Sequence, residues 1–533
     1  MAFSGFIGPV VERELRVLSR RRRHYGLRFG YCLLLIGIVT AAWLVSMDSL
    51  TQRSAESAAA HLTARMGAVS RHVVSTVLWF QFVVANLLAV VFVSDALVEE
   101  RDKGTLEVLL ATPIRASEIV VGKLLARILP ILTLLAITLP LLAIVRLWGG
   151  VPWSNVLSST MITLSAVLLV GALTLMGSLW ARRSHQVMVM MMVCLATLYM
   201  LSLLAHDRLG GFPAWLKQGI LLVNPISMFI YAKNQQLQAQ ATPADQYLWL
   251  NHFLTVSVLS LGLLALVAWR LRPSVVGRRI QLWGRFRKPA LRPVTGSCLL
   301  WLQLRRSVGR QLLSHAWVYL LVGAPLVVLA VQCWRTGPIG LSFRLWSVLQ
   351  TELWMVLAVT TIAGSALAIS RQKDQRAWPL LLTTPLTDGA IVRDLTWSVL
   401  LKNGGAWLTL FASSLLVWWV IFRRNDLSDP FTVTFQLVVA LLRIPTYVMF
   451  LIGVGMYAGL RCAGGATAVM AALAILVCRY TIEKQIFWSV AYFALGAKRS
   501  GLVACQATVL GLDLLLGLLL LQRTKATLRR YCL

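Results

Sequence analysis

The sequence predicts an all-α, polytopic membrane protein with about twelve transmembrane helices in two parallel six-helix repeats. Two observations lead to this class. Hydrophobic residues fill 58% of the 533 positions and charged residues only 13%, a balance that soluble domains do not have. The apolar residues also gather in runs of about 20, the length that crosses a ~30 Å hydrocarbon core as a helix. Helices are expected there because each backbone group must find its hydrogen-bond partner within its own segment.

The predicted spans divide into two modules along the chain. The first module should supply spans near residues 25–46, 73–95, 125–148, 156–180, 186–205 and 249–270. The second should supply spans near residues 316–334, 346–370, 404–422, 436–460, 464–481 and 501–522. We place the modules at residues 1–285 and 286–533, because the basic stretch from Pro273 to Pro293 has no apolar periodicity and is typical of a linker. Six spans is an even number, so both modules should enter the membrane in the same direction.

The distribution of charge predicts the orientation. The formal net charge of +31 comes from 51 Lys and Arg residues against 20 Asp and Glu residues. The heaviest basic clusters lie before the first span and between the modules, so the positive-inside rule predicts cytoplasmic N- and C-termini in a bacterial-type cytoplasmic (inner) membrane. These clusters flank spans and lack interleaved aromatic residues. We therefore expect anionic lipids as their counter-charge, and no nucleic acid.

Motifs for catalysis, metals and cofactors are absent from the sequence. The eight cysteines form no C-x-x-C pair, no H-E-x-x-H occurs, and Gly122 and Lys123 lack the upstream glycine of a phosphate-binding loop. Four scattered histidines near the predicted outer face are expected to be solvated, not gathered around a metal: His61, His72, His206 and His252. The sequence therefore predicts no catalytic residue, no metal site and no cofactor in this chain.

A polar connector between the second and third spans occurs twice. The stretch Val98–Lys123 returns in altered form at Ser370–Leu395, which indicates that one folded unit was used twice, an internal repeat. A membrane protein would ordinarily place a short loop here, so an amphipathic connector suggests a docking surface in the cytoplasm. A single shift of 272 residues aligns Ala96, Asp102, Leu109, Leu110, Thr112, Pro113, Ile119 and Val120 with Ala368, Asp374, Leu381, Leu382, Thr384, Pro385, Ile391 and Val392.

The first connector should contain a short two-faced helix. Gly104 and Thr105 can stop the preceding helix and cap a new one, with the Thr105 hydroxyl accepting from free backbone N–H groups. Pro113 disfavours helix at Thr112 and should end the element within two turns. The expected apolar face consists of Leu106, Leu109 and Leu110. An acidic edge that could pair with a partner's Arg or Lys consists of Glu99, Glu100, Asp102 and Glu107.

Inside the spans, charged residues and glycines carry the remaining information. Arg443 and Asp513 lie at similar predicted depth and could neutralise each other as an intramembrane charge pair. A role in substrate passage, or a shifted boundary near Pro445 that places Arg443 near water, stays open. Glycines that should allow close helix packing are Gly171, Gly177, Gly453 and Gly459. Between spans 5 and 6, an apolar stretch broken by Pro213 and Pro225 predicts a short re-entrant or interfacial helix pair.

At the connector, the sequence resembles the permeases of ATP-binding cassette (ABC) transporters of the type 2 exporter class. The connector of that family commonly reads E-R-E-x-G-T-L-E-x-L-L-x-T-P, and Pro9–Arg16 is similar to its N-terminal elbow. The matching residues are Glu99, Glu100, Arg101, Gly104, Thr105, Leu106, Glu107, Leu109, Leu110, Thr112 and Pro113. The resemblance implies that this connector is the coupling helix, which docks on a dimer of separate ATPase subunits that bind ATP and Mg²⁺.

The second connector is less similar to the family. Gly104, Thr105 and Glu107 correspond to Arg376, Ala377 and Pro379, so a coupling role is open there. The residues that would form it are Trp378, Leu381, Leu382, Thr384 and Pro385.

The expected function is therefore a permease subunit that couples ATP hydrolysis by a cytoplasmic partner to export of an unidentified substrate. One chain with two modules could form the pathway, or it could pair with a second permease chain. Two alternatives stay open: an ion-driven secondary transporter, and a membrane anchor or assembly protein that has a permease fold without transporting anything.

Overall fold

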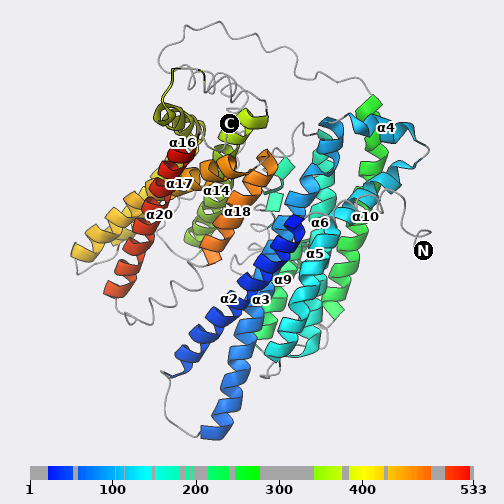
Figure 1. The fold of residues 1–533 in the computed structure, drawn as a ribbon. Coiled ribbons are helices and arrows are strands. Elements are labelled where there is room, and N and C mark those ends of the chain that lie inside the picture. Colours follow the sequence, from blue (N-terminus) through cyan, green and yellow to red (C-terminus); the bar gives the residue numbers. More distant parts are fainter. Residues whose placement is uncertain are drawn as a thin grey trace. The chain divides into compact units, whose positions relative to one another are not determined.

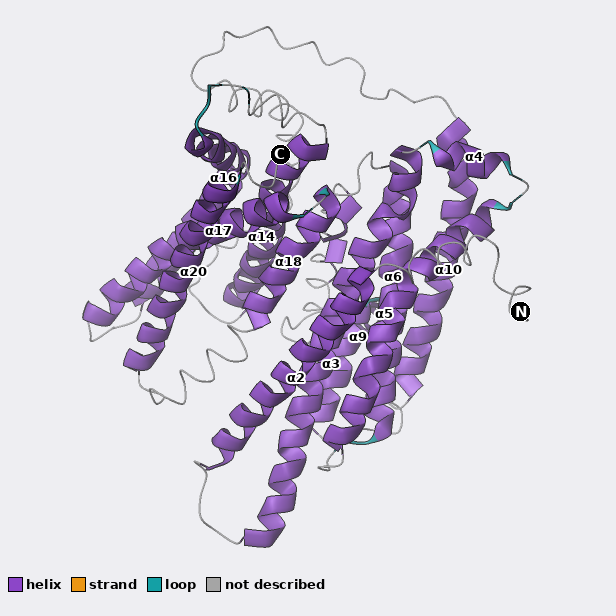
Figure 2. Cartoon of the chain, in the orientation of Figure 1, coloured by secondary structure: helices purple, strands orange, loops and turns teal. Residues whose placement is uncertain are grey.

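The computed structural model describes most of the chain, and nearly all of the described residues lie in helices (Figure 1). The described residues are 22–51, 58–102, 104–112, 114–146, 151–180, short pieces of 187–198, 214–238, 247–276, 341–374, 383, 385–424, 430–462, 464–481 and 499–528. No strand occurs among them (Figure 2). Together with the apolar composition, this confirms the predicted class, an all-α polytopic membrane protein.

Two compact units make up the chain, and the boundary between them falls between Leu282 and Trp283, with Arg208–Gly210 assigned to the second unit. The described helices of the first unit are α2 (Arg22–Thr51), α3 (Ala58–Asp102), α4 (Thr105–Ala111), α5 (Ala116–Arg146), α6 (Trp153–Trp180), α8 (Ala214–Val223), α9 (Pro225–Gln238) and α10 (Leu248–Val276). Those of the second are α14 (Leu341–Asp374), α16 (Asp388–Arg424), α17 (Pro430–Arg461), α18 (Gly465–Thr481) and α20 (Arg499–Thr527).

Ten of the twelve predicted spans coincide with or lie within these long helices. The span predicted at 186–205 is described only in short pieces, and the one predicted at 316–334 lies outside the described residues, as does the elbow at Pro9–Arg16. Within the described residues, the stretches that are long and apolar enough to cross a membrane are Val69–Val98, Ala116–Arg146, Trp153–Trp180, Leu248–Leu271, Leu353–Ser370 and Leu441–Arg461.

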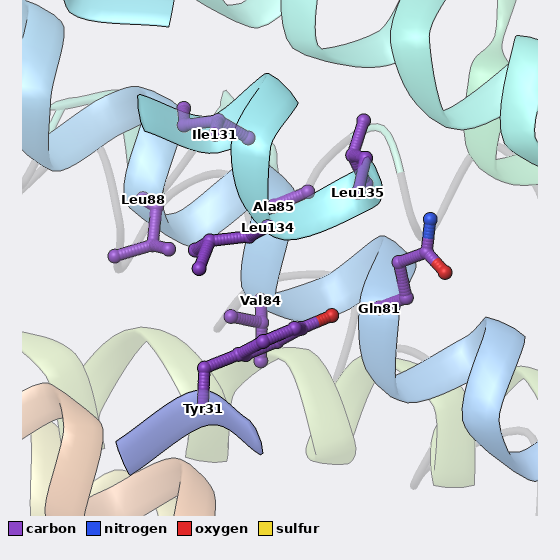
Figure 3. A pocket seen from close by; sticks show the side chains of 8 residues that line it. All are labelled: Tyr31, Gln81, Val84, Ala85, Leu88, Ile131, Leu134 and Leu135. Carbon is purple, nitrogen blue, oxygen red and sulfur yellow. The ribbon is translucent and has the colours of Figure 1, made fainter. Parts of the chain in front are cut away.

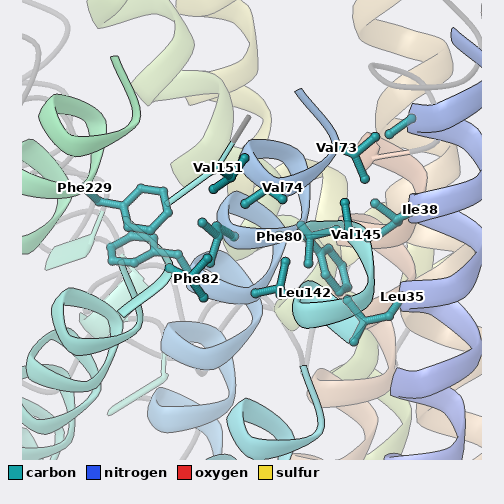
Figure 4. Close-up of a cluster of buried hydrophobic side chains, with 14 of the residues drawn as sticks. Leu35, Ile38, Val73, Val74, Phe80, Phe82, Leu142, Val145, Val151 and Phe229 are labelled. Carbon is teal, nitrogen blue, oxygen red and sulfur yellow. The ribbon is translucent and has the colours of Figure 1, made fainter. Parts of the chain in front are cut away.

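In the first unit, α3 and α6 form the centre. Helix α3 packs against α2, α5, α6 and α9, and α6 packs in turn against α10. The buried core between them is largely aromatic and aliphatic (Figure 4). Phe82 of α3 and Phe229 of α9 stack with ring centroids 4.4 Å apart, and Tyr31 of α2 stacks on Phe80 at 6.0 Å. Each such pair stabilises the fold by about 0.5–1.5 kcal/mol beyond the contribution of the apolar area that it buries.

The predicted broken helix pair between spans 5 and 6 is present as α8 and α9. Asn224 separates the two helices: its side chain donates to Leu198 O at 2.6 Å and accepts from the backbone N of Ile226 at 3.0 Å. Lys233 of α9 lies over the ring of Trp79, with Nζ 5.5 Å from the centroid. Burial lowers the pKa of the Lys233 ammonium, because desolvation disfavours its charged form.

In the second unit, α17 is the central helix and packs against α14, α16, α18 and α20. Glycines lie where α17 comes closest to the backbones of its neighbouring helices. A Cβ added at Gly453 would lie 2.6 Å from the backbone O of Gly517 on α20, and one at Gly459 would meet the backbone of Ala366 on α14. In the first unit, a Cβ at Gly171 would lie 2.8 Å from the Leu124 side chain. The prediction that these glycines allow close helix packing is confirmed.

Candidate functional site

The first connector contains a seven-residue helix, α4, between α3 and α5. It begins after Gly104, whose φ of 69° and ψ of 5° lie in the left-handed region that favours glycine. The backbone N of Gly104 donates to Arg101 O at 3.1 Å, which closes the end of α3. At the other end, Thr112 is extended, and its Oγ1 donates to Leu109 O at 2.5 Å. Pro113 itself lies outside the described residues.

The predicted role of Thr105 as a helix cap is wrong. Gly104 occupies the cap position, and no side chain there accepts from the backbone N–H groups of α4. The Thr105 hydroxyl lies near Glu100 instead, 3.2 Å from its backbone O and in contact with its carboxylate Oε2. The left-handed Gly104 already turns the chain between α3 and α4. The Thr105 hydroxyl can therefore donate to the preceding Glu100, which attaches α4 to the last turns of α3.

The apolar residues of α4 separate into a buried and an outward set. Leu106 is only 1% exposed and packs into the unit, whereas Val108 is 67% exposed. Leu109 and Leu110 are half-buried. The predicted face of three leucines is therefore divided: Leu106 anchors the helix, and Val108, which the sequence reasoning passed over, presents the most exposed apolar side chain.

Glu100 is the centre of the polar contacts at the base of the connector. Lys123 Nζ of α5 lies 3.0 Å from Glu100 Oε1, and the Lys123 side chain is only 3% exposed while that of Glu100 is 22% exposed. The acidic edge that could pair with a partner's Arg or Lys stays a prediction, but within the chain the Glu100 carboxylate already binds Lys123 and Thr105. The side chains of Glu99, Asp102 and Glu107 are outside the described set.

A second fastening joins the end of α3 to the end of α6. Arg101 Nη2 donates to Leu179 O at 3.4 Å, and Leu179 is the penultimate residue of α6. The last carbonyls of a helix have no partner within the helix and carry its negative dipole end, so a cation is stabilised there. Arg101 is therefore placed to hold the ends of the second-span and fourth-span helices together.

The second unit repeats this fastening. Lys373 Nζ donates to the carbonyl O of Leu460, the penultimate residue of α17. The shift of 272 residues that aligns the connectors places Arg101 on Lys373. Sequence reasoning missed both contacts, because nothing in one sequence tells which carbonyl a basic residue at a helix end will reach.

The ends of the two connectors also keep the same register. Helix α3 ends at Asp102 and α14 at Asp374, while α5 begins at Ala116 and α16 at Asp388. The backbone N of Ile119 donates to Arg115 O at 3.2 Å, and the backbone N of Ile391 donates to Thr387 O at 3.1 Å. Each of these four pairs is related by 272 residues.

Of the residues predicted to form the second connector, only Pro385 is described, and it is exposed. Trp378, Leu381, Leu382 and Thr384 lie outside the described residues.

The predicted pair between Arg443 and Asp513 does not form. Asp513 of α20 accepts from Arg479 of α18 instead, in a bidentate pair at 2.8 Å to Oδ1 and 2.5 Å to Oδ2. The Arg479 guanidinium also lies over the rings of Tyr447 and Phe450, 4.9 Å and 5.2 Å from their centroids. Arg443 is exposed and lies over Trp354 at 5.4 Å. The prediction that Asp513 pairs with an intramembrane arginine is correct, but the arginine is Arg479, because the rotation of each helix determines which arginine faces Asp513.

Within the described part of the chain, no group of three or more His, Cys, Asp or Glu side chains could hold a metal ion. The buried His252 has a structural place. Its Nδ1 lies 2.9 Å from Leu222 O of α8 and its Nε2 lies 3.4 Å from Ser165 Oγ of α6. The expectation that His252 is solvated is therefore wrong.

The fold and the connector together define a class: a multi-pass helical membrane protein whose first unit carries a short amphipathic helix between its second and third spans. The chain belongs to the ABC-2 transporter family, because the model of that family, described as ABC-2 family transporter protein, matches residues 9–275, half of the chain. It is thus an ABC transporter permease, a membrane component of a transport system. No curated protein matches the chain.

Proposed function

We propose that this chain couples ATP hydrolysis by a separate cytoplasmic ATPase to export of a substrate, and that α4 is the coupling helix. The observation that carries the proposal is the way α4 is held. Its apolar anchor Leu106 is buried, its base is fastened to α3 and α5 through Glu100, and Val108 stands out from the surface. A helix so attached can transmit a displacement instead of absorbing it.

The polar contacts supply a path for that displacement. Movement of α4 would pass through Thr105 and Glu100 to the end of α3, through Lys123 to α5, and through Arg101 to the end of α6. Packed helices shift as rigid bodies, since a close-packed interior does not deform continuously. Closure of the ATPase dimer around nucleotide would thus move the second, third and fourth spans of the first module together.

The second module keeps only part of this machinery. The shared register of its connector ends and the Lys373 contact support the internal repeat. The residues that correspond to Glu100 and Lys123 are Gln372 and Leu395, which cannot form an ion pair. We infer that the intact connector couples to the ATPase and that the second module follows its movement.

The remaining partners follow from the sequence. The ATPase would act as a dimer and bind ATP and Mg²⁺, whereas this chain would contribute no catalytic residue. The basic termini and linker favour contact with anionic lipids and cytoplasmic N- and C-termini in an inner membrane. Figure 1 shows α4 at the end of the first unit at which α10 also ends, which supports one cytoplasmic side for the connector and the linker. If both modules line one pathway, this chain needs no second permease chain.

The substitution Val108→Asp tests the proposal directly. Val108 is 67% exposed, so the charge should leave the fold intact while it places a carboxylate in the proposed apolar contact. We expect co-purification of the partner ATPase to fall at least tenfold, because burying an unpaired charge costs more than the ~1.4 kcal/mol that corresponds to a tenfold change in affinity. The matched control is Leu125→Asp on α5, which is 48% exposed and lies within the apolar stretch Ala116–Arg146. Equal loss of ATPase in both variants, or in neither, would contradict the proposed role of α4.

A further inference from the structure

A narrow crevice lies inside the first unit between α2, α3 and α5 (Figure 3). In this conformation its walls leave no room for a water molecule. Six of its lining side chains are apolar and two are polar, and none is charged. The lining residues are Tyr31, Gln81, Val84, Ala85, Leu88, Ile131, Leu134 and Leu135.

Gln81 is the unusual member of this lining. It lies within the apolar stretch Val69–Val98 and is only 1% exposed. Neither its Nε2 nor its Oε1 has a hydrogen-bond partner among the described residues. The neighbouring Tyr31 does not supply one, because its hydroxyl pairs with Thr138 Oγ1 of α5 at 3.0 Å.

An unsatisfied amide in the interior of a membrane protein is costly, since neither water nor lipid tails can take its hydrogen bonds. Polar groups kept at such a depth are generally functional. The crevice is too narrow for water here, so a bridging water does not satisfy Gln81 in this conformation. The amide is therefore set to bind a group that is not part of this unit.

We propose that this crevice is a cargo subsite and that it takes a neutral, amphipathic molecule, whose hydrogen-bonding group meets Gln81 while its apolar body lies on Leu88, Leu134 and Leu135. The inference rests on the proposed function and adds the chemical class of the cargo. An amide both donates and accepts, so hydroxyl, amide and ester groups all fit. A charged cargo is excluded because no lining residue could neutralise it.

Helix α2 is the wall that can move to admit the cargo. One of its faces packs on the unit through Tyr31 and Leu35, which are 7% and 1% exposed. Its other face is open, with Phe29 at 72% and Leu33 at 61%. Because α2 packs on α3 and α5 through one face only among the described helices, a displacement of α2 away from α3 would widen the crevice enough to admit an amphipathic molecule.

Photolabelling of the full chain in lipid nanodiscs tests the subsite. The probe is 4-(hydroxymethyl)benzophenone, and the labelled peptides are mapped by mass spectrometry. Labelling is expected on peptides that contain Leu88 or Leu134. Excess benzyl alcohol should compete, whereas benzoate and benzylammonium should not. The variant Gln81→Leu should lower the labelling about fivefold or more, because one or two hydrogen bonds are lost.

The control is Asn86→Leu, which removes another buried amide of α3. Asn86 is 5% exposed, its Nδ2 donates to Phe82 O at 2.8 Å, and its Oδ1 has no hydrogen-bond partner among the described residues, but it does not line the crevice. Its labelling should match that of the native chain. If Gln81→Leu fails to give a monodisperse protein, Leu88→Trp, which fills the crevice, decides the question by abolishing the labelling.

Equal labelling of native and Gln81→Leu protein, or competition by the charged compounds, would overturn the subsite. Co-purification of the ATPase is scored in the same preparations. A retained ATPase with no crevice labelling would overturn the subsite alone, and crevice labelling without any ATPase would overturn the proposed function alone.

Discussion

Replacing Lys123 with Leu should destabilise the first unit and uncouple it from the ATPase. The ammonium is 3% exposed and lies 3.0 Å from Glu100, whose carboxylate would lose this contact in a largely buried place. Removing one partner of a fully buried pair costs roughly 3 to 5 kcal/mol. The cost here should be smaller, because Glu100 is 22% exposed and water screens part of its charge. Thermal unfolding of the purified chain measures the loss.

A second substitution separates the effect on stability from the effect on coupling. The double variant Glu100→Gln with Lys123→Leu carries the residues that the second module has at Gln372 and Leu395. It should regain most of the unfolding temperature, since both charges are gone, yet ATPase activity of the complex should stay unresponsive to the permease. A double variant less stable than Lys123→Leu alone would show that the ion pair is not the source of the loss.

The contacts of Arg101 and Lys373 should have the next largest effect. Replacing either with Met removes the donor that reaches Leu179 O or Leu460 O at the end of the fourth-span helix of its module. We expect hydrogen exchange in the last turn of α6 or of α17, respectively, to accelerate about fivefold, because a cation at a helix C-terminus contributes roughly 0.3–1 kcal/mol. Each variant should affect only its own unit.

Two exposed basic residues serve as controls for this experiment. Arg115 precedes α5 and Arg523 lies near the end of α20, and both are exposed. Arg115→Met and Arg523→Met should leave exchange at the ends of α6 and α17 unchanged. If all four variants accelerate exchange equally, loss of surface charge explains the result and the two contacts hold nothing together.

Long apolar runs allowed the membrane helices to be predicted closely, because the bilayer imposes both their length and their helical form. The connector was also predictable in outline: Gly104 interrupts the helix where expected, and the aligned ends at Asp102 and Asp374 follow the predicted shift. These features depend on local sequence and on the period of one repeat.

The contacts of individual polar side chains were not predictable, because they depend on how each helix is rotated about its axis. Their similar predicted depth in the membrane suggested that Arg443 pairs with Asp513. The rotation of the helices about their axes instead places Arg479 against Asp513. For the same reason, the ion pair between Glu100 and Lys123 could not be predicted from the sequence. Gln81 gave no signal at all, since one amide in an apolar run is common and only burial on every side makes it unusual.

Crosslinking from Val108 shows whether α4 contacts the ATPase. A photoreactive p-benzoylphenylalanine would be placed at Val108, which is 67% exposed on α4, and at Leu125 as the control position in the complex with its ATPase. We expect a crosslink from position 108 to the ATPase subunit, altered by nucleotide, and only lipid adducts from position 125. Lipid adducts or periplasmic proteins captured from position 108, with no ATPase, would contradict it.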